Sequence, residues 1–321
     1  MTSAMNKTCA IAIDIGGTKI ATGFVDPTAP TTVHGRATRP TRAADGPRVV
    51  VREIIDAATS IIANANADGY VPTCVGVGAP GVVDTRTGCI SYAGPTMPGW
   101  AGTDIASTLR AALGLPVSVH NDVRVMGLGE AVHGAAAGNT GDVLFVSIGT
   151  GIGGALVTGG QLPQSPHDIR GEIAYLLAPV PAGNGCDTIE NIGSGPSLTR
   201  SYNTAVSGTP AKDLREVMRR YHDGEDLARR VITDSLRCVG EGLAAFINAI
   251  DVSAVVIGGG VGTLGEPILG PLRQGLRNGL LAPLCNIPIV QAALGTNAPL
   301  VGAAHMAHTD ILASTHLMKE Q

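Results

Sequence analysis

The stretch CAIAIDIGGTKIATGFVD, residues 9–26, contains two apolar runs separated by a pair of glycines. The first run reaches Asp14, the chain turns at Gly16 and Gly17, and the second apolar run follows. Apolar runs on either side of a glycine turn predict two strands joined by that turn. The pattern recurs in VLFVSIGTGIGGALVTGG, residues 143–160, and this weak internal duplication indicates two related halves.

Strand and helix patterns alternate along the rest of the chain. Apolar residues at helical spacing predict helices over residues 46–66, 103–114, 224–249 and 298–314 and within PILGPLRQGLRNGLL. Buried strands are predicted over residues 74–84, 116–122 and 254–262, and residues 161–210 are rich in loops. We expect Thr103 to cap the 103–114 helix and Gly114 to end it. This alternation favours an α/β fold with mixed sheets.

The composition is that of a globular protein, with 44% hydrophobic and 15% charged residues in a chain of 321. Its length allows two domains or one large one. The net charge of −4 and the lack of long basic runs argue against nucleic-acid binding. The six cysteines show no CxxC pair, which indicates free buried thiols in a reducing cytosol. Without an evident signal peptide or membrane span, we expect a soluble cytoplasmic protein.

Glycine turns follow three of the predicted strands, after Asp14, Ser147 and Ile257. Such turns can point several backbone N–H groups at a phosphate without side chains in the way. One turn alone could equally be a tight hairpin, but three in one chain favour a nucleotide site. Two matches to G-x-G-x-x-G, at 76–81 and 149–154, are followed by strand patterns, whereas the dinucleotide fingerprint requires a helix there.

Two aspartates stand at the ends of predicted strands, beside a glycine turn and an asparagine. Asp14 ends a strand immediately before a glycine turn, where its carboxylate could reach a phosphate-bound Mg²⁺ directly or through water. Asp122 ends another strand beside Asn121 and suits a general base with a hydroxyl-binding neighbour. An Asn-Asp pair taken alone is better explained by capping of the following helix.

Seven motifs in order give the chain a resemblance to the ROK family of sugar kinases and repressors. They are DIGGTK (14–19), GVGAPGVVD (76–84), ND (121–122), SIGTGIGG (147–154), GEIAY (171–175), IENIGSGPSL (189–198) and VVIGGGV (255–261). The resemblance covers about residues 9–314. It implies an actin/hexokinase-like (ribonuclease H-like) ATPase fold, in which two α/β domains flank a cleft. The expected domains are residues 1–120 with 297–321, closed by the last helix, and residues 121–296.

The resemblance also implies a role for individual residues. Asp122 matches the catalytic base, and Asp14 would lie by the Mg²⁺ that accompanies ATP. The expected ATP-binding positions are Gly16, Gly17, Thr18, Lys19, Gly149, Thr150, Gly151, Gly153, Gly258, Gly259 and Gly260. The expected sugar-binding positions are Gly81, Thr96, Asn121, Glu172, Tyr175 and Glu190.

The chain departs from the family pattern at its metal site and its sugar loop. Relatives usually carry GE-x-G-H and then C-x-C-x4-C, whose histidine and cysteines bind a structural zinc. Here Tyr175 takes the histidine position, and the cysteine positions hold Pro181, Gly183 and Thr188. Cys186 is the one thiol nearby, and a single thiolate cannot complete a tetrahedral site. We therefore expect no structural zinc.

The expected function is ATP-dependent phosphorylation of a hexose or N-acetylhexosamine at O6. Tyr175, and Thr96 where relatives often have asparagine, place activity on glucose in doubt and make N-acetylmannosamine the lead substrate. The alternatives are a glucokinase and a sugar-binding protein with weak or no catalysis. A repressor is disfavoured because about eight residues precede the first strand. Relatives are commonly oligomers, so a homodimer is expected, with no membrane or nucleic-acid partner.

Overall fold

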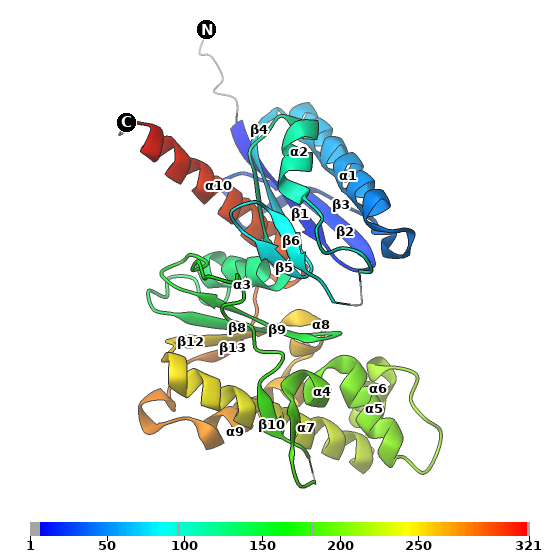
Figure 1. The fold of residues 1–321 in the computed structure, drawn as a ribbon. Helices are drawn as coiled ribbons and strands as arrows, with labels where there is room; N and C mark the ends of the chain where they lie inside the picture. The colour runs from blue at the N-terminus through cyan, green and yellow to red at the C-terminus, as the bar shows by residue number, and fades with distance from the viewer. Residues whose placement is uncertain (1–6, 95–96, 182, 320–321) are drawn as a thin grey trace. The chain divides into compact units, whose positions relative to one another are not determined.

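The computed structural model describes residues 7–94, 97–181 and 183–319 (Figure 1). Over this part of the chain, packing divides the protein into two compact units. The first holds the described residues up to Ala137 together with Gln161–Arg170 and the chain from Thr296 onward. The second holds Gly138–Gly160 and Gly171–Gly295.

The first unit is built on a mixed sheet with the strand order β3-β2-β1-β4-β7. Its strands are β1 (Lys7–Ile15), β2 (Lys19–Val25), β3 (Val33–Pro40), β4 (Tyr70–Ala79) and β7 (Val117–Asn121). β1 pairs antiparallel with β2, which confirms the predicted strand–turn–strand of residues 9–26. β4 runs parallel to both β1 and β7, so the carboxyl ends of these three strands meet at one edge.

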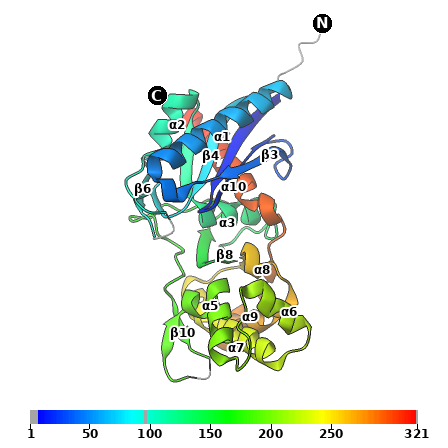
Figure 2. The same cartoon turned by 90° about the vertical axis from the view of Figure 1, so that its right-hand side faces the viewer.

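Helices cover both faces of this sheet. The helices are α1 (Pro47–Ala67), α2 (Ile105–Leu113), α3 (Asp122–His133) and α10 (Ala298–Lys319). On β4, Val77 shares a core with Ile61 of α1, whereas the neighbouring Gly76 lies against the backbone of Ala303 in α10. Because side chains alternate along a strand, α1 and α10 lie on opposite faces. Figure 2 shows α1 in front of the strands and α10 behind them.

The boundaries of the first unit differ from the predicted domain limits. The sequence placed residues 121–137 with the second domain, but α3 packs against α10 and belongs to the first unit. Gly129 and Gly302 bring the two helices together, because a Cβ at Gly302 would overlap the carbonyl oxygen of Val125. Packing of glycine against backbone is not visible in a hydrophobic pattern.

Helix α2 begins at a different cap from the one predicted. Asp104, rather than Thr103, is the N-cap, and its Oδ1 accepts a hydrogen bond from the backbone of Ser107 at 3.0 Å. Aspartate and threonine are both favoured N-caps, so adjacent candidates cannot be separated from residue type alone. Gly114 ends the helix as predicted, with a left-handed φ of 66°.

The second unit contains a sheet with the order β13-β12-β8-β9. Its strands are β8 (Val143–Ile148), β9 (Ile152–Val157), β12 (Ala254–Gly258) and β13 (Ile289–Gln291). Its helices are α4 (Ile189–Gly193), α5 (Gly195–Ala205), α6 (Leu214–His222), α7 (Asp226–Ile250), α8 (Gly259–Gly262) and α9 (Glu266–Gly279). Small antiparallel pairs are formed by β5 (Val82–Asp84) with β6 (Cys89–Tyr92) in the first unit and by β10 (Leu177–Pro179) with β11 (Cys186–Thr188) in the second.

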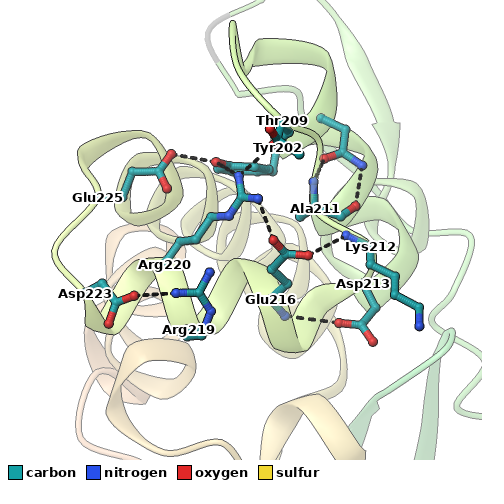
Figure 3. A network of polar contacts seen from close by, with 11 residues as sticks. Tyr202, Thr209, Ala211, Lys212, Asp213, Glu216, Arg219, Arg220, Asp223 and Glu225 are labelled. Atoms are coloured by element: carbon teal, nitrogen blue, oxygen red, sulfur yellow. Dashed lines mark hydrogen bonds and ion pairs between the residues drawn. The ribbon is translucent and has the colours of Figure 1, made fainter.

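A polar network fixes α5, α6 and the start of α7 to one another (Figure 3). The side chain of Tyr202 is buried, and its hydroxyl group bonds Glu225 and Arg220, each at 2.6 Å. Arg220 also pairs with Glu216 at 2.5 Å. Each of these charged groups has a partner within the network, so the network has the character of a structural anchor.

The structure bears on two further sequence expectations. None of the helices in the described residues has both the length and the apolar composition that a membrane span requires. All six cysteines are free, but only Cys9, Cys74 and Cys238 are buried. Cys186 is exposed, so the expectation of buried thiols was wrong at that position.

Candidate active site

The parallel strands of the first unit bring the two predicted aspartates to one edge of its sheet. Asp14 on β1 pairs in register with Gly78 on β4, and Ala79 pairs with Asn121 on β7. A Cβ built on Gly78 would lie 3.7 Å from Oδ1 of Asp14 and 3.4 Å from Cα of Asp122. Gly78 therefore leaves open the space that separates the two acids.

The surroundings of these acids favour their protonated forms. Burial, and after it the neighbouring charge of Asp122, raise the pKa of Asp14 from 3.8 to about 7. Lys19 and Arg36 act in the opposite direction. Burial also raises the pKa of Asp122, against the hydrogen bonds that its carboxylate accepts. A pair of carboxylates that repel each other in a poorly solvated place is typical of a functional site.

Asn121 holds Asp122 in a defined orientation. Its Nδ2 donates to Oδ1 of Asp122 and to the carbonyl oxygen of Gly81, both at 3.0 Å. Its Oδ1 accepts from the backbone of Arg124 at 3.1 Å and caps α3. The capping role weighed from the sequence is therefore present, and Asp122 is the first residue of the helix rather than the end of the strand.

The first glycine turn is braced by a residue that the sequence did not single out. The backbone N–H of Gly16 donates to the carbonyl of Lys19 at 2.9 Å and closes the turn. Thr41, which follows β3 and is completely buried, donates its hydroxyl group to the carbonyl of Gly16 at 2.6 Å. Nothing lies within 4 Å of a Cβ built on Gly17, so the turn has open space beside it. Thr18 and Lys19 are exposed at this turn.

The turn that carries Gly81, a predicted sugar-binding position, is likewise held by residues that are distant in sequence. Gly81 has a φ of 96°, and a Cβ there would overlap the carbonyl of Tyr92. The indole Nε1 of the buried Trp100 donates to the carbonyl of Pro80 at 3.1 Å. Trp100 thus fixes the turn that carries Gly81. Thr96 lies outside the described residues.

The second unit brings its own glycine turns together. β8 and β12 are parallel neighbours, and Ser147 pairs in register with Gly258. Gly259 has a φ of 83°, and its absent Cβ would lie 2.7 Å from both the backbone nitrogen of Ile148 and the hydroxyl of Ser147. The predicted phosphate loop (residues 149–153) and the predicted adenosine motif (residues 258–260) therefore share one edge of this sheet.

Backbone bonds also join the segments that carry the two predicted sugar-binding glutamates. The N–H groups of Ile189 and Glu190 donate to the carbonyls of Leu176 and Ala174, at 2.8 and 3.4 Å. Glu172 is exposed, and its Oε1 accepts from the backbone of Ala174 at 3.1 Å.

The positions that carry zinc in relatives hold no comparable cluster. Within residues 7–94, 97–181 and 183–319, no group of three or more histidine, cysteine or acidic side chains is arranged to hold a metal ion. Cys186 lies exposed on β11, and the side chain of Tyr175 is 72% exposed. The absence of structural zinc stays a prediction.

The first unit carries acids and a glycine turn at the carboxyl ends of its parallel strands, and the second carries glycine turns there. Two such units define an α/β hexokinase-like fold. Residues 10–310 match the sequence profile of the ROK family, and the chain belongs to that family. The glucokinase of Streptomyces coelicolor is 30% identical, covering 92% of this chain and 96% of its own length. The N-acetylmannosamine kinase of Escherichia coli is 28% identical, with coverages of 94% and 99%.

A solved structure supports the same conclusion. A ROK family glucokinase from Streptomyces griseus, in complex with glucose and AMPPNP, superposes with a TM-score of 0.77 at 29% identity. The match covers 94% of this chain and 99% of that structure. The predicted family and fold class are confirmed, and the chain is a homologue of ATP-dependent sugar kinases.

Proposed function

We propose that this protein transfers the γ-phosphoryl group of ATP to O6 of a hexose or an N-acetylhexosamine. The observation that carries this proposal is the pair Asp14 and Asp122, which lie on either side of Gly78 beside a glycine turn. The sugar-kinase homologues that cover more than nine-tenths of the chain support it.

Asp122 would act as the general base. Its carboxylate would take the proton of the sugar hydroxyl while the hydroxyl oxygen attacks the γ-phosphorus and ADP leaves. Burial raises the pKa of this carboxyl group, which brings a carboxylate closer to the range where it accepts a proton efficiently near neutral pH. Oδ1 of Asp122 is already held by Asn121 and by the backbone of Val123 at 2.9 Å, so its orientation is set before a sugar binds.

Asp14 fits the Mg²⁺ that accompanies ATP. Its donor atoms are carboxylate oxygens, which this cation prefers. The pKa of Asp14 is raised because Lys19 and Arg36 do not offset the effects of burial and of the charge of Asp122, so a further cation would stabilise the carboxylate. When bound, the cation neutralises charge on the phosphates. Gly16, Gly17, Thr18 and Lys19 would place backbone N–H groups and one ammonium group near those phosphates.

In the second unit, ATP would meet backbone rather than side chains. Gly149, Thr150, Gly151 and Gly153 would approach the phosphates, and Gly258, Gly259 and Gly260 would lie near the adenosine. The positive φ of Gly259 and its close approach to Ile148 support this use of glycine. Catalysis would consist mainly of positioning and charge stabilisation.

We infer that N-acetylmannosamine is the lead sugar, with glucose as the alternative. Gly81, Asn121, Glu172 and Glu190 keep the residue types of the sugar-binding positions. Tyr175 replaces a histidine, and Thr96 replaces an amide, so the pocket would differ from that of a glucokinase. A sugar-binding protein with weak catalysis is the second candidate, because these two changes fall on sugar contacts.

The deciding experiment is a coupled ADP-release assay with glucose, mannose, allose, N-acetylglucosamine and N-acetylmannosamine. We expect turnover with at least one of them, and a loss on the order of 10²–10⁴ in kcat for Asp122→Asn. The isosteric asparagine keeps an oxygen for the backbone N–H of Val123, so the fold should survive, as circular dichroism would check. Parental turnover by that variant would disprove the base assignment. Sugar binding without ADP release would favour the second candidate.

A further inference from the structure

The carboxylate of Glu190, which is a predicted sugar-binding residue, contacts the loop 149–153. Its Oε2 accepts a hydrogen bond from the backbone N–H of Ile152 at 2.9 Å. A Cβ on Gly151 would lie 2.5 Å from the same oxygen. A side chain at position 151 would therefore displace this carboxylate from its place against the loop.

Backbone bonds hold the chain around Glu190 on both sides. On one side, the N–H of Ile189 donates to the carbonyl of Leu176 at 2.8 Å. On the other side, the N–H of Gly195 donates to the carbonyl of Gly149 at 2.8 Å. The buried hydroxyl of Ser197 donates to the carbonyl of Glu190 at 3.0 Å and fixes the short helix α4 between them. These bonds connect the loop 149–153 directly to the segment that carries Glu190.

We propose that Glu190 is a positioning residue that couples sugar binding to nucleotide binding. This inference rests on the proposed function, in which the loop 149–153 holds phosphates. A carboxylate that touches this loop repels an incoming phosphate as long as its charge is uncompensated. Sugar hydroxyls that donate to its Oε1 would draw charge away from the loop, while Oε2 keeps the N–H of Ile152 in place. The sugar would thus tighten nucleotide binding, and by linkage the nucleotide would tighten sugar binding by the same factor.

The test is calorimetric titration of AMPPNP with Mg²⁺, with and without each sugar of the panel at saturation. For the parent protein, we expect the best sugar to lower the Kd of AMPPNP by about 5- to 100-fold. Glu190→Gln keeps an oxygen acceptor but removes the charge. In the absence of sugar, this variant should bind AMPPNP more tightly than the parent does. The ratio of its AMPPNP Kd values without and with sugar should approach one.

Two further variants make the outcome specific. Glu172→Gln is the matched control, because the side chain of Glu172 accepts a hydrogen bond within its own segment. This variant should lower sugar affinity but keep the parental ratio of AMPPNP Kd values without and with sugar. Gly151→Ala disturbs the same contact from the loop side, while residue 190 remains a glutamate. Its ratio of AMPPNP Kd values without and with sugar should also approach one. Retention of the parental ratio by Glu190→Gln would overturn the proposal, as would a parent protein that phosphorylates a sugar but shows equal Kd values. Coupling without turnover would instead count against the proposed kinase activity.

Discussion

The half-buried carboxylate of Asp14 should lower the stability of the free protein as the pH rises. Its pKa is raised from 3.8 to about 7, a difference of about 3 pH units that corresponds to about 4 kcal/mol. Below pH 3.8, the carboxyl group is protonated in both the folded and the unfolded chain. As the pH rises toward 7, the unfolded chain loses this proton first, so the free energy of unfolding falls.

Asp14→Asn removes this titration while keeping the size of the side chain. We therefore expect its stability to equal that of the parent near pH 4 and to exceed it by up to about 4 kcal/mol at pH 8 without Mg²⁺. Urea unfolding can report on the relevant unit alone, because the single tryptophan, Trp100, is buried in the first unit together with Asp14.

The control and the refuting result are both defined by the structure. Asp68→Asn changes an exposed aspartate at the end of α1 and should leave the pH profile parallel to that of the parent. If Asp14→Asn gave the same change in stability at pH 4 and pH 8, the reasoning from burial and from the charge of Asp122 would be wrong. Asp122→Asn should lower the pKa of Asp14, because it removes a neighbouring negative charge, and carbon NMR of the carboxyl groups would detect this.

Three further predictions concern the supports of the site. Thr41→Val removes a buried hydrogen bond to Gly16, so it should lower the free energy of unfolding by about 1–3 kcal/mol and raise the KM for ATP. Urea unfolding and steady-state kinetics would measure these two effects. Parental values in both would refute the bracing role of Thr41. Gly259→Ala should weaken AMPPNP binding in calorimetry, because the methyl group would meet Ile148 at a φ of 83°, and parental affinity would contradict this. Burial, and then the charges of His133 and His308, lower the pKa of His305 from 6.5 to about 4. Its contribution to the free energy of unfolding is therefore fully present above pH 6.5 and is lost as the pH falls toward 4, because the unfolded chain takes up the proton first. His305→Gln should therefore lose less stability than the parent between pH 6.5 and 4 in thermal unfolding, and parallel curves would argue against this.

Much of the fold was accessible from the order of local patterns. The apolar runs on either side of Gly16 and Gly17 form β1 and β2, and helical spacing over residues 46–66 corresponds to α1. These patterns are readable because a strand or helix repeats its buried face every two or 3.6 residues. The segment 161–210, expected to be rich in loops, also contains β10, β11, α4 and α5, whose short lengths give little periodic signal.

The sequence by itself determined the family, the two glycine-rich halves and the residue types available for chemistry. Only the tertiary structure placed Asp14 beside Asp122, because their approach depends on the order of β1, β4 and β7 and on the register at Gly78. The supports from Thr41 and Trp100, and the contact of Glu190 with Ile152, also became visible only in three dimensions. Each joins positions 20 to 38 residues apart, and no local pattern specifies which distant backbone group a side chain will meet.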